Sequence, residues 1–346
     1  MPATSIPHKV RLAYMVSHPI QYQAPLLRRL AQEPDVDLTV LFGSDLSTRG
    51  YRDHGFGVDV AWDTPLLEGY HSRFLPAWRD NGTVSATTPL SRNLLRALRN
   101  ADGSPAFDAL WVHGYASLNS LQAILAAHAL GIPVLLRAES WLGERKRSSG
   151  KLAAKNAFLR ALCHTVAATL PIGSHNAAYW TTYFGKQTPQ FPVPYAVDNA
   201  FFANRAAASR AELDTLRLEL GLEPGRPVIL FASKLQKRKG AADLLEAFRR
   251  LCENESLSPL PYLVIVGDGE ERARLQWLCE DAGLEDVRFA GFRNQTELPR
   301  FFALADLFVL PSREEPWGLI VNEAMAAGCP VVVLSLIHIS EPTRPY

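Results

Sequence analysis

The chain has little cysteine, almost no net charge and no long apolar run. Its four cysteines, Cys163, Cys252, Cys279 and Cys329, show no C-x-x-C spacing, which argues against a zinc site or a disulfide framework. We therefore expect them to be small buried hydrophobic residues in a reducing compartment. Thirty-six basic residues against 35 acidic ones leave a net charge of +1, whereas a dedicated nucleic-acid-binding protein is normally strongly basic.

Membrane-spanning and secretory signals are also missing. No stretch reaches the roughly 18 apolar residues that a membrane helix requires, and residues 1–9 lack the apolar core of a signal peptide. These absences predict a cytoplasmic protein, either free or held peripherally on the inner face of the plasma membrane. With 346 residues, of which 47% are hydrophobic and 21% charged, the chain is long enough for two globular domains.

Apolar runs alternate with helical patterns along the first half of the chain. The runs occupy residues 10–16, 38–42, 109–112, 134–136 and 165–170, and the helical patterns occupy residues 22–31, 118–130, 152–163 and 175–184. This alternation predicts an α/β fold in which a parallel sheet carries helices on both faces. Prolines at residues 192 and 194 interrupt the pattern, which restarts at Val228. We therefore predict a first domain over residues 1–195 and a second over residues 196–333.

Two carboxylates lie around a turn late in the chain. Glu315 and Glu323 are separated by seven residues and follow the apolar run at residues 304–310, a pattern that predicts a strand, a turn and a helix. Backbone N–H groups at the helix start, near Gly318 and Leu319, suit a diphosphate, and the carboxylates suit sugar or ribose hydroxyls. The alternative is that these are ordinary acids near a helix N-terminus, stabilised by the helix dipole.

A cationic loop follows the apolar strand predicted at residues 228–231. It contains Lys234, Lys237, Arg238 and Lys239 and ends at Gly240, before an amphipathic helical pattern. In isolation such a loop is typical of an exposed turn. Next to the paired glutamates it favours an anion-binding site instead. We expect Lys237 and Arg238 to be solvated surface cations.

Together these segments resemble the retaining GT-B glycosyltransferases of family 4 (group 1), and the resemblance extends over about residues 9–333. In that family the E-x7-E motif binds the donor sugar nucleotide, and a G-R-L-x-x-x-K-G loop neutralises the leaving diphosphate. The resemblance implies this second role for Lys234 and Lys239. Here Ser233 replaces the glycine and Lys234 replaces the arginine, so the charge is kept but the planar fork of donors is lost.

The resemblance also implies a GT-B fold, with two Rossmann-like domains facing each other across a cleft. Gly267 and Gly269 form a turn after a predicted strand that lies near the nucleotide in the family, and Asn294 falls where the family binds the base. A structural turn and a helix cap are the alternatives for these residues. Arg272 stands where a dinucleotide fingerprint requires its third glycine, so that motif is excluded.

Three residues on the acceptor side follow predicted strands of the first half. His113 resembles the family histidine that approaches the donor sugar, or else it is a structural histidine. His18 opens the first helix and has either a functional or a structural role. Glu139 either hydrogen-bonds an acceptor hydroxyl or pairs with Arg137.

These patterns predict a retaining hexosyltransferase-type enzyme of polysaccharide or cell-envelope biosynthesis. It would move a sugar from a nucleoside diphosphate sugar to a hydroxyl of a glycan or lipid-linked acceptor, with no further cofactor and no protein nucleophile. Asp35 and Asp37 have the D-x-D form of a metal-binding motif, but they precede an ordinary strand and are predicted to form a turn. The alternatives are a GT-B epimerase or phosphorylase, and a catalytically silent module that binds sugar nucleotides.

Two segments bear on location and completeness. Six cations surround a helical stripe of Leu152, Leu159 and Leu162, which indicates either an interfacial helix on anionic lipid or a solvated surface helix. These cations are Arg145, Lys146, Arg147, Lys151, Lys155 and Arg160. Residues 334–344 resemble a translated sequencing adapter, so we expect residues 334–346 to be a non-native tail and the second domain to be truncated after Val333. Such a chain is expected to be unstable and weakly active or inactive.

Overall fold

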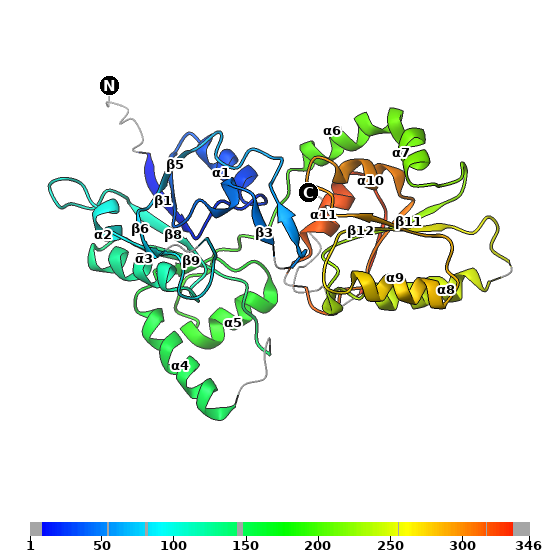
Figure 1. Ribbon diagram of the computed structural model, residues 1–346. Coiled ribbons are helices and arrows are strands. Elements are labelled where there is room, and N and C mark those ends of the chain that lie inside the picture. The colour runs from blue at the N-terminus through cyan, green and yellow to red at the C-terminus, as the bar shows by residue number, and fades with distance from the viewer. Residues whose placement is uncertain are drawn as a thin grey trace, which may run out of the picture. The chain divides into compact units, whose positions relative to one another are not determined.

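The computed structural model describes residues 9–53, 55–79, 82–143, 148–254, 256–315 and 317–334. Arg145, Lys146, Arg147 and all but the first residue of the adapter-like tail lie outside these described residues. The chain forms two units (Figure 1). Unit 1 comprises Met1–Arg49 and Pro65–Tyr195, and unit 2 comprises Gly50–Thr64 and Ala196–Tyr346. The sequence-based division assigned residues 50–64 to the first domain, whereas Gly50–Thr64 belongs to unit 2.

Unit 1 is built on a parallel sheet with the strand order β10-β9-β8-β1-β2-β5. Its strands are β1 (Val10–Val16), β2 (Val36–Phe42), β5 (His71–Phe74), β8 (Ala109–His113), β9 (Val134–Arg137) and β10 (Ala168–Thr169), with a separate antiparallel pair of β6 (Ala77–Arg79) and β7 (Leu90–Ser91). Its helices are α1 (Ala24–Ala31), α2 (Leu94–Ala97), α3 (Leu118–Ala129), α4 (Ser149–Cys163) and α5 (Ser174–Phe184), with a 3₁₀ turn at Leu46–Thr48.

Helices cover both faces of the unit 1 sheet, because its strands are apolar on both sides. Helix α1 packs on one face through Leu27, against Tyr14 and Trp111. Helices α3, α4 and α5 pack on the other face, and Trp180 of α5 is fully buried there. Ser117 caps α3 by accepting a hydrogen bond from the backbone N–H of Ser120 at 3.1 Å, which satisfies a donor that the helix itself cannot use.

Unit 2 repeats this plan with a parallel sheet in the order β13-β12-β11-β14-β15. Its strands are β11 (Val228–Ala232), β12 (Tyr262–Val266), β13 (Val287–Gly291), β14 (Leu307–Leu310) and β15 (Val331–Val333), and the hairpin of β3 (Tyr51–Asp53) and β4 (Val58–Val60) belongs to the same unit. Its helices are α6 (Asn199–Ser209), α7 (Leu213–Glu219), α8 (Ala241–Cys252), α9 (Arg272–Asp281), α10 (Leu298–Leu304) and α11 (Leu319–Ala326), with 3₁₀ turns at Arg210–Glu212 and Lys237–Lys239.

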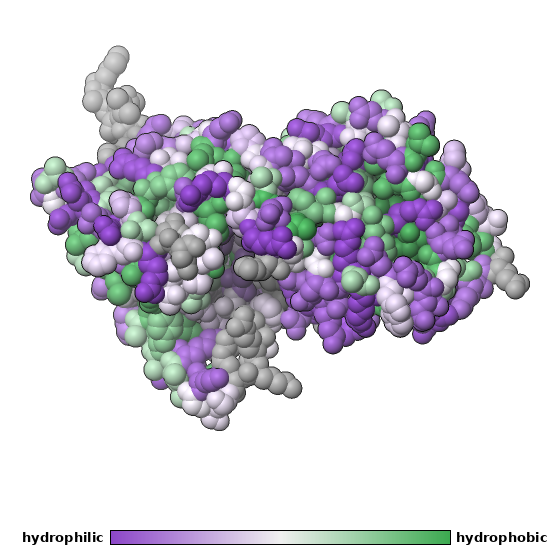
Figure 2. All heavy atoms as spheres, in the orientation of Figure 1, coloured by the Kyte–Doolittle hydropathy of each residue, from purple (hydrophilic) through white to green (hydrophobic). Residues whose placement is uncertain are grey.

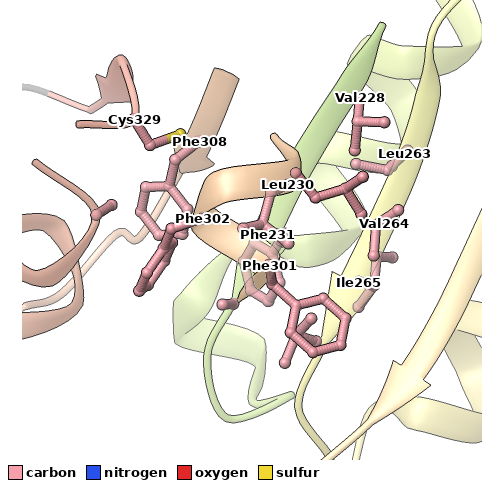
Figure 3. Close-up of a cluster of buried hydrophobic side chains, with 14 of the residues drawn as sticks. Val228, Leu230, Phe231, Leu263, Val264, Ile265, Phe301, Phe302, Phe308 and Cys329 are labelled. Atoms are coloured by element: carbon pink, nitrogen blue, oxygen red, sulfur yellow. The ribbon is translucent and has the colours of Figure 1, made fainter. Parts of the chain in front are cut away.

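The core of unit 2 lies between the central strands and the helices on both faces. In Figure 1, α8 and α9 lie on one face of the sheet, and α6, α7 and α10 lie on the other. Figure 3 shows Phe302 of α10 next to Phe308 of β14, with ring centroids 5.8 Å apart, and both side chains are buried. Strand β12 is buried at all five positions, as expected for the interior of a parallel sheet.

The predicted α/β fold with parallel sheets is confirmed. The segment around Pro192 and Pro194 forms no helix and runs extended, with the N–H groups of Phe191 and Val193 donating to the carbonyls of Thr169 and Pro171. Two differences concern boundaries. The strand predicted at residues 165–170 is shortened to β10, because the turn that closes α4 occupies its first residues. Helix α1 begins at Ala24 because Pro25 favours the first turn of a helix.

Candidate functional site

One acid and one cation of the two unit 2 motifs form a buried ion pair. Lys239, in the loop after β11, donates to the carboxylate of Glu315, in the loop after β14. The two side chains are only 9% and 10% exposed. Burial lowers the pKa of Lys239 and Glu315 raises it, while the neighbouring charges of Arg238 and Lys234 lower it further. The Ser312 hydroxyl also donates to Glu315, at 3.3 Å.

Glycines fix the approach of these loops to each other. Gly240 begins α8 with a φ of 74°, and a Cβ at this position would lie 2.2 Å from the Pro311 carbonyl oxygen. No other residue can occupy that position without moving the loop after β14. Arg238 adds a second connection, because its carbonyl accepts from the Arg313 N–H at 2.8 Å and its guanidinium donates to the Glu314 carbonyl at 3.1 Å. Lys237 and Arg238 are both exposed, as predicted.

The Gly267–Gly269 turn after β12 packs on the backbone that carries Lys234. A Cβ on Gly267, whose φ is 129°, would lie 1.9 Å from the Ser233 carbonyl oxygen, and one on Gly269 would lie 2.6 Å from that of Leu235. The Leu235 N–H donates to the Asp268 carbonyl at 2.8 Å. The two glycines therefore allow two strand-end loops to touch through their backbones. Lys234 itself donates to Asp53 at 2.8 Å.

Glu323 lies in a different environment from Glu315. It belongs to α11, which begins at Leu319 with Gly318 as its N-cap in the left-handed region, at a φ of 84°. The Glu323 side chain is 6% exposed and accepts a hydrogen bond from the Gln295 amide at 3.1 Å. Burial raises its pKa to about 7, and the Gln295 hydrogen bond opposes this only in part. A carboxyl group in this state can donate or accept near neutral pH.

Asn294, predicted to bind the donor, makes a contact within unit 2. Its side-chain amide donates to the Ala61 carbonyl at 2.6 Å, and its backbone N–H donates to Glu297 at 3.2 Å. The neighbouring Thr296 N–H donates to the Asp63 carboxylate at 3.2 Å. The start of α10 therefore holds the segment that follows the β3–β4 hairpin, an arrangement that the sequence patterns did not indicate.

A second polar cluster lies at the carboxyl ends of β8 and β9 in unit 1. His113 and Arg137 are the last residues of these strands and stand in register. The Arg137 guanidinium stacks 4.1 Å from the centroid of the Tyr195 ring, and the Tyr195 hydroxyl donates to Glu139. The ring of Tyr22 meets Tyr195 edge-on, with centroids 5.5 Å apart. Tyr195 therefore connects residues that the sequence pattern could only place on separate strands.

Arg137 is 1% exposed, and its three guanidinium nitrogens have no hydrogen-bond partner among the described residues. One of the two alternatives for Glu139 was an ion pair with Arg137. Among the described residues no such pair is found, and Glu139 accepts a hydrogen bond from Tyr195 instead. Burial, together with the nearby charge of Arg137, lowers the pKa of His113 to about 3. The imidazole is therefore neutral at pH 7 and can exchange hydrogen bonds without carrying charge.

His18 and the D-x-D residues lie at different places on the unit 1 sheet. His18 follows β1, its Nδ1 lies 2.8 Å from the Ser17 hydroxyl, and burial lowers its pKa to about 4. Asp35 and Asp37 are exposed at the start of β2, which is the end of that strand remote from the carboxyl edge. Ligands of parallel sheets bind at the carboxyl edge. Asp35 lies in a turn as predicted, whereas Asp37 is the second residue of β2 and belongs to the strand.

The motif-bearing half of the chain matches a known family. Residues 214–339 match the family described as "Glycosyl transferases group 1". The chain carries a group 1 glycosyltransferase domain. That domain contains Lys234, Lys239, Glu315 and Glu323, and so includes both motifs on which the resemblance was based.

Relatives of the group 1 domain act in different pathways. The lipopolysaccharide core biosynthesis glycosyltransferase LpsE of Rhizobium meliloti is 39% identical over 127 residues, covering 36% of this chain and 33% of LpsE. A GDP-mannose-dependent phosphatidylinositol monomannoside mannosyltransferase of Mycobacterium tuberculosis is 35% identical over 172 residues, covering 46% of this chain and 42% of the relative. The chain therefore matches less than half of the length of either relative.

Solved structures extend the likeness over both units. HepE of Anabaena, crystallised with UDP, has a TM-score of 0.65 at 19% identity, covering 94% of this chain and 80% of HepE. The catalytic domain of starch synthase IV of Arabidopsis thaliana, bound to ADP and acarbose, has a TM-score of 0.65 at 14% identity, covering 97% of this chain and 86% of that domain. At such low identity the likeness shows the fold alone, which is GT-B.

Three residues at these sites were missed from the sequence. Tyr195 ends a proline-rich connection and Gln295 follows Asn294, and neither residue belongs to a motif in the sequence. Asp53 lies in a segment without a clear apolar pattern, although an aspartate two residues before Gly55 is typical of an Asx turn. That turn would have predicted the local backbone. It could not have predicted that Asp53 would become the partner of Lys234, which lies 181 residues away in the cationic loop of the group 1 domain.

Proposed function

We propose that the protein is a retaining glycosyltransferase that transfers a hexosyl group from a nucleoside diphosphate sugar to a hydroxyl of a glycan or lipid-linked acceptor. The observation that carries the proposal is the buried Lys239–Glu315 ion pair, which joins the loops after β11 and β14. Burying charges costs stability unless they are well paired. The Lys239–Glu315 pair lies at the carboxyl edge of a parallel sheet, where ligands bind. Its position therefore favours a role in binding a charged ligand.

The names of the relatives support the same substrate classes. One relative is named as GDP-mannose-dependent, and HepE was crystallised with UDP, which supports a nucleotide sugar donor. The names of LpsE and the mannosyltransferase refer to lipopolysaccharide core and to a phosphatidylinositol mannoside, which supports a glycan or lipid-linked acceptor of the cell envelope.

Each residue has a role in this proposal. Lys234 and Lys239 stabilise the charge that develops on the leaving diphosphate, together with the N-terminus of α11 at Gly318 and Leu319. Glu315 and Glu323 orient the donor sugar. His113 and Glu139 contribute hydrogen bonds from unit 1. No side chain is assigned as a nucleophile, so the leaving group and the acceptor would react on the same face of the sugar.

The proposal is tested by Glu315→Gln, which keeps the size of the side chain and removes its charge. We expect sugar transfer to fall by about two orders of magnitude, the effect of losing a group that orients the substrate. Nucleoside diphosphate release with a panel of donors and glycan acceptors measures this. Removing one partner of a buried ion pair also destabilises a protein, by roughly 3–5 kcal/mol, so thermal unfolding is measured on every variant.

Lys237→Ala is the matched control, because Lys237 lies in the same cationic loop but is exposed. It should transfer sugar at the unaltered rate. Transfer by Glu315→Gln at that same rate would contradict the proposal. If the unaltered protein binds a nucleotide sugar and never releases the nucleoside diphosphate, it is a binding module instead.

Peripheral contact with an anionic membrane is the second part of the proposal. Among the described residues, no helix combines the length and the apolar character needed to cross a bilayer. The predicted leucine stripe of α4 is wrong for Leu159 and Leu162, which are buried in the core of unit 1. The helix instead presents Leu152 and Phe158, which are 42% and 39% exposed, beside exposed Lys151 and Arg160. Figure 2 shows hydrophobic and hydrophilic residues next to each other over this helix. Lys155 takes another role, stacking 4.5 Å from the ring centroid of Tyr179.

A further inference from the structure

The β3–β4 hairpin reaches the candidate donor site through Asp53. The Lys234 ammonium donates to both carboxylate oxygens of Asp53, at 2.8 and 3.0 Å. The side chain of Asp53 is 13% exposed and that of Lys234 is 32% exposed, so the contact is partly shielded from water. An ion pair shielded in this way is stronger than one on the open surface.

The Asp53 carboxylate is held in place by its own turn. The backbone N–H groups of Gly55 and Phe56 donate to the same Asp53 oxygen, at 2.7 and 2.9 Å. Burial raises the pKa of Asp53, but the hydrogen bonds from Lys234, Phe56 and Gly55 outweigh it and hold the pKa below its usual value. The carboxylate is thus a fixed, charged acceptor for the lysine.

The hairpin is fastened to unit 2 at two further places. The Phe56 ring lies 4.5 Å from the Lys234 ammonium and meets Phe292 edge-on, with ring centroids 4.8 Å apart. In the segment that follows the hairpin, Ala61 and Asp63 accept the hydrogen bonds from Asn294 and Thr296 described above. Aromatic pairs and hydrogen bonds of this kind resist displacement of the hairpin.

We propose that Asp53 is a positioning residue for Lys234, which it orients for contact with the diphosphate of the donor. A lysine side chain is flexible and loses rotamer freedom when it is fixed, whereas the planar fork of an arginine is pre-organised and loses less for each hydrogen bond that it forms. An ammonium group has three donors. Two of them go to Asp53, and the third remains for a phosphate oxygen. The inference rests on the proposed function.

Asp53→Ala tests the inference. We expect kcat for sugar transfer to fall on the order of 10- to 100-fold, the effect of a misplaced group at a reacting centre, while KM for the donor changes little because the charge of Lys234 remains. The matched control is Asp59→Ala in the other strand of the same hairpin. Asp59 pairs with Arg52 only at 3.8 Å, and its side chain is 79% exposed. It should leave kcat unchanged.

Rescue distinguishes positioning from a purely structural role. In a Lys234→Arg background the guanidinium is organised without help, so adding Asp53→Ala should cost less than threefold. Gly55→Ala gives an independent variant that keeps the carboxylate. A Cβ on Gly55 would lie 2.7 Å from both Cδ and Nζ of Lys234, so the lysine must move and kcat should again fall.

Each result decides the question. Unchanged kcat in Asp53→Ala and Gly55→Ala, both folded as judged by circular dichroism, would overturn the inference. Tighter binding of UDP and faster transfer by Asp53→Ala would also overturn it, because Asp53 would then compete with the donor. If the unaltered protein neither binds UDP or GDP in calorimetry nor transfers sugar, the proposed function fails first. If it does both and only the Asp53 prediction fails, the proposed function stands alone.

Discussion

At the scale of residues, the two glutamates of the E-x7-E spacing are chemically unlike. Glu315 is buried against an ammonium group and a hydroxyl. Glu323 is buried against the amide of Gln295. An ammonium group stabilises a carboxylate far better than a neutral amide does, so burial raises the pKa of Glu323 to about 7. Two glutamates with only seven residues between them thus lie in different electrostatic environments.

Glu323 should make stability depend on pH in a predictable direction. Its folded pKa of about 7 lies above the ordinary value of 4.5, so the native state holds a proton that the unfolded state has lost between these pH values. Stability is therefore greatest below about pH 4.5 as far as this group is concerned, and it falls as pH rises to about 7. The loss is on the order of 3 kcal/mol. Glu323→Gln should abolish this component.

Urea unfolding of the unaltered protein and of Glu323→Gln at pH 5 and pH 7.5 measures the effect. Relative to the unaltered protein, Glu323→Gln should have a higher unfolding free energy at pH 7.5 than at pH 5. The contributions of His18 and His113 cancel in this comparison, because both proteins contain them. Their lowered pKa values act in the opposite direction and remove stability as pH falls below about 6.5. A difference that is the same at both pH values would contradict the prediction.

At the scale of elements, several site residues stand where a strand becomes a loop. Lys234, Gly267 and Glu315 follow β11, β12 and β14, and His113 ends β8. These elements are predictable because each is an apolar run followed by glycine, proline or a charged loop. The β3–β4 hairpin is different. Its strands have three residues each and no apolar alternation, so local pattern does not identify it.

Helix α4 carries the prediction for membrane contact. Reversing two exposed charges, Lys151→Glu with Arg160→Glu, should lower binding to vesicles of anionic lipid at low salt by roughly tenfold or more, since each cation near such a surface contributes about 1 kcal/mol. Co-sedimentation measures the binding. Arg250→Glu, on α8 of unit 2, is the control for charge reversal elsewhere on the surface. If the unaltered protein does not sediment with these vesicles, α4 is a solvated surface helix.

At the scale of the whole molecule, each unit has its own sheet and core, so a ligand of unit 2 should stabilise that unit. A nucleoside diphosphate sugar at about 100 times its dissociation constant should add about 2.7 kcal/mol to the unfolding free energy. This should raise Tm by several degrees in a thermal-shift panel of UDP-, GDP- and ADP-sugars. Lys239→Met should lose the shift, and uridine, which has no phosphate, should not produce one. A panel without any Lys239-dependent shift would contradict the donor assignment.

The sequence alone determined the fold class, the order of the main strands and helices, and the two motifs of the group 1 domain. It could do so because apolar periodicity, glycine turns and short motifs are local properties of the chain. Only the tertiary structure decided which charges meet. Lys239 with Glu315, Lys234 with Asp53, and Tyr195 with Arg137 and Glu139 are pairs between segments far apart in the chain. Burial, which sets the pKa of Glu323 and His113, likewise exists only after the layers have packed.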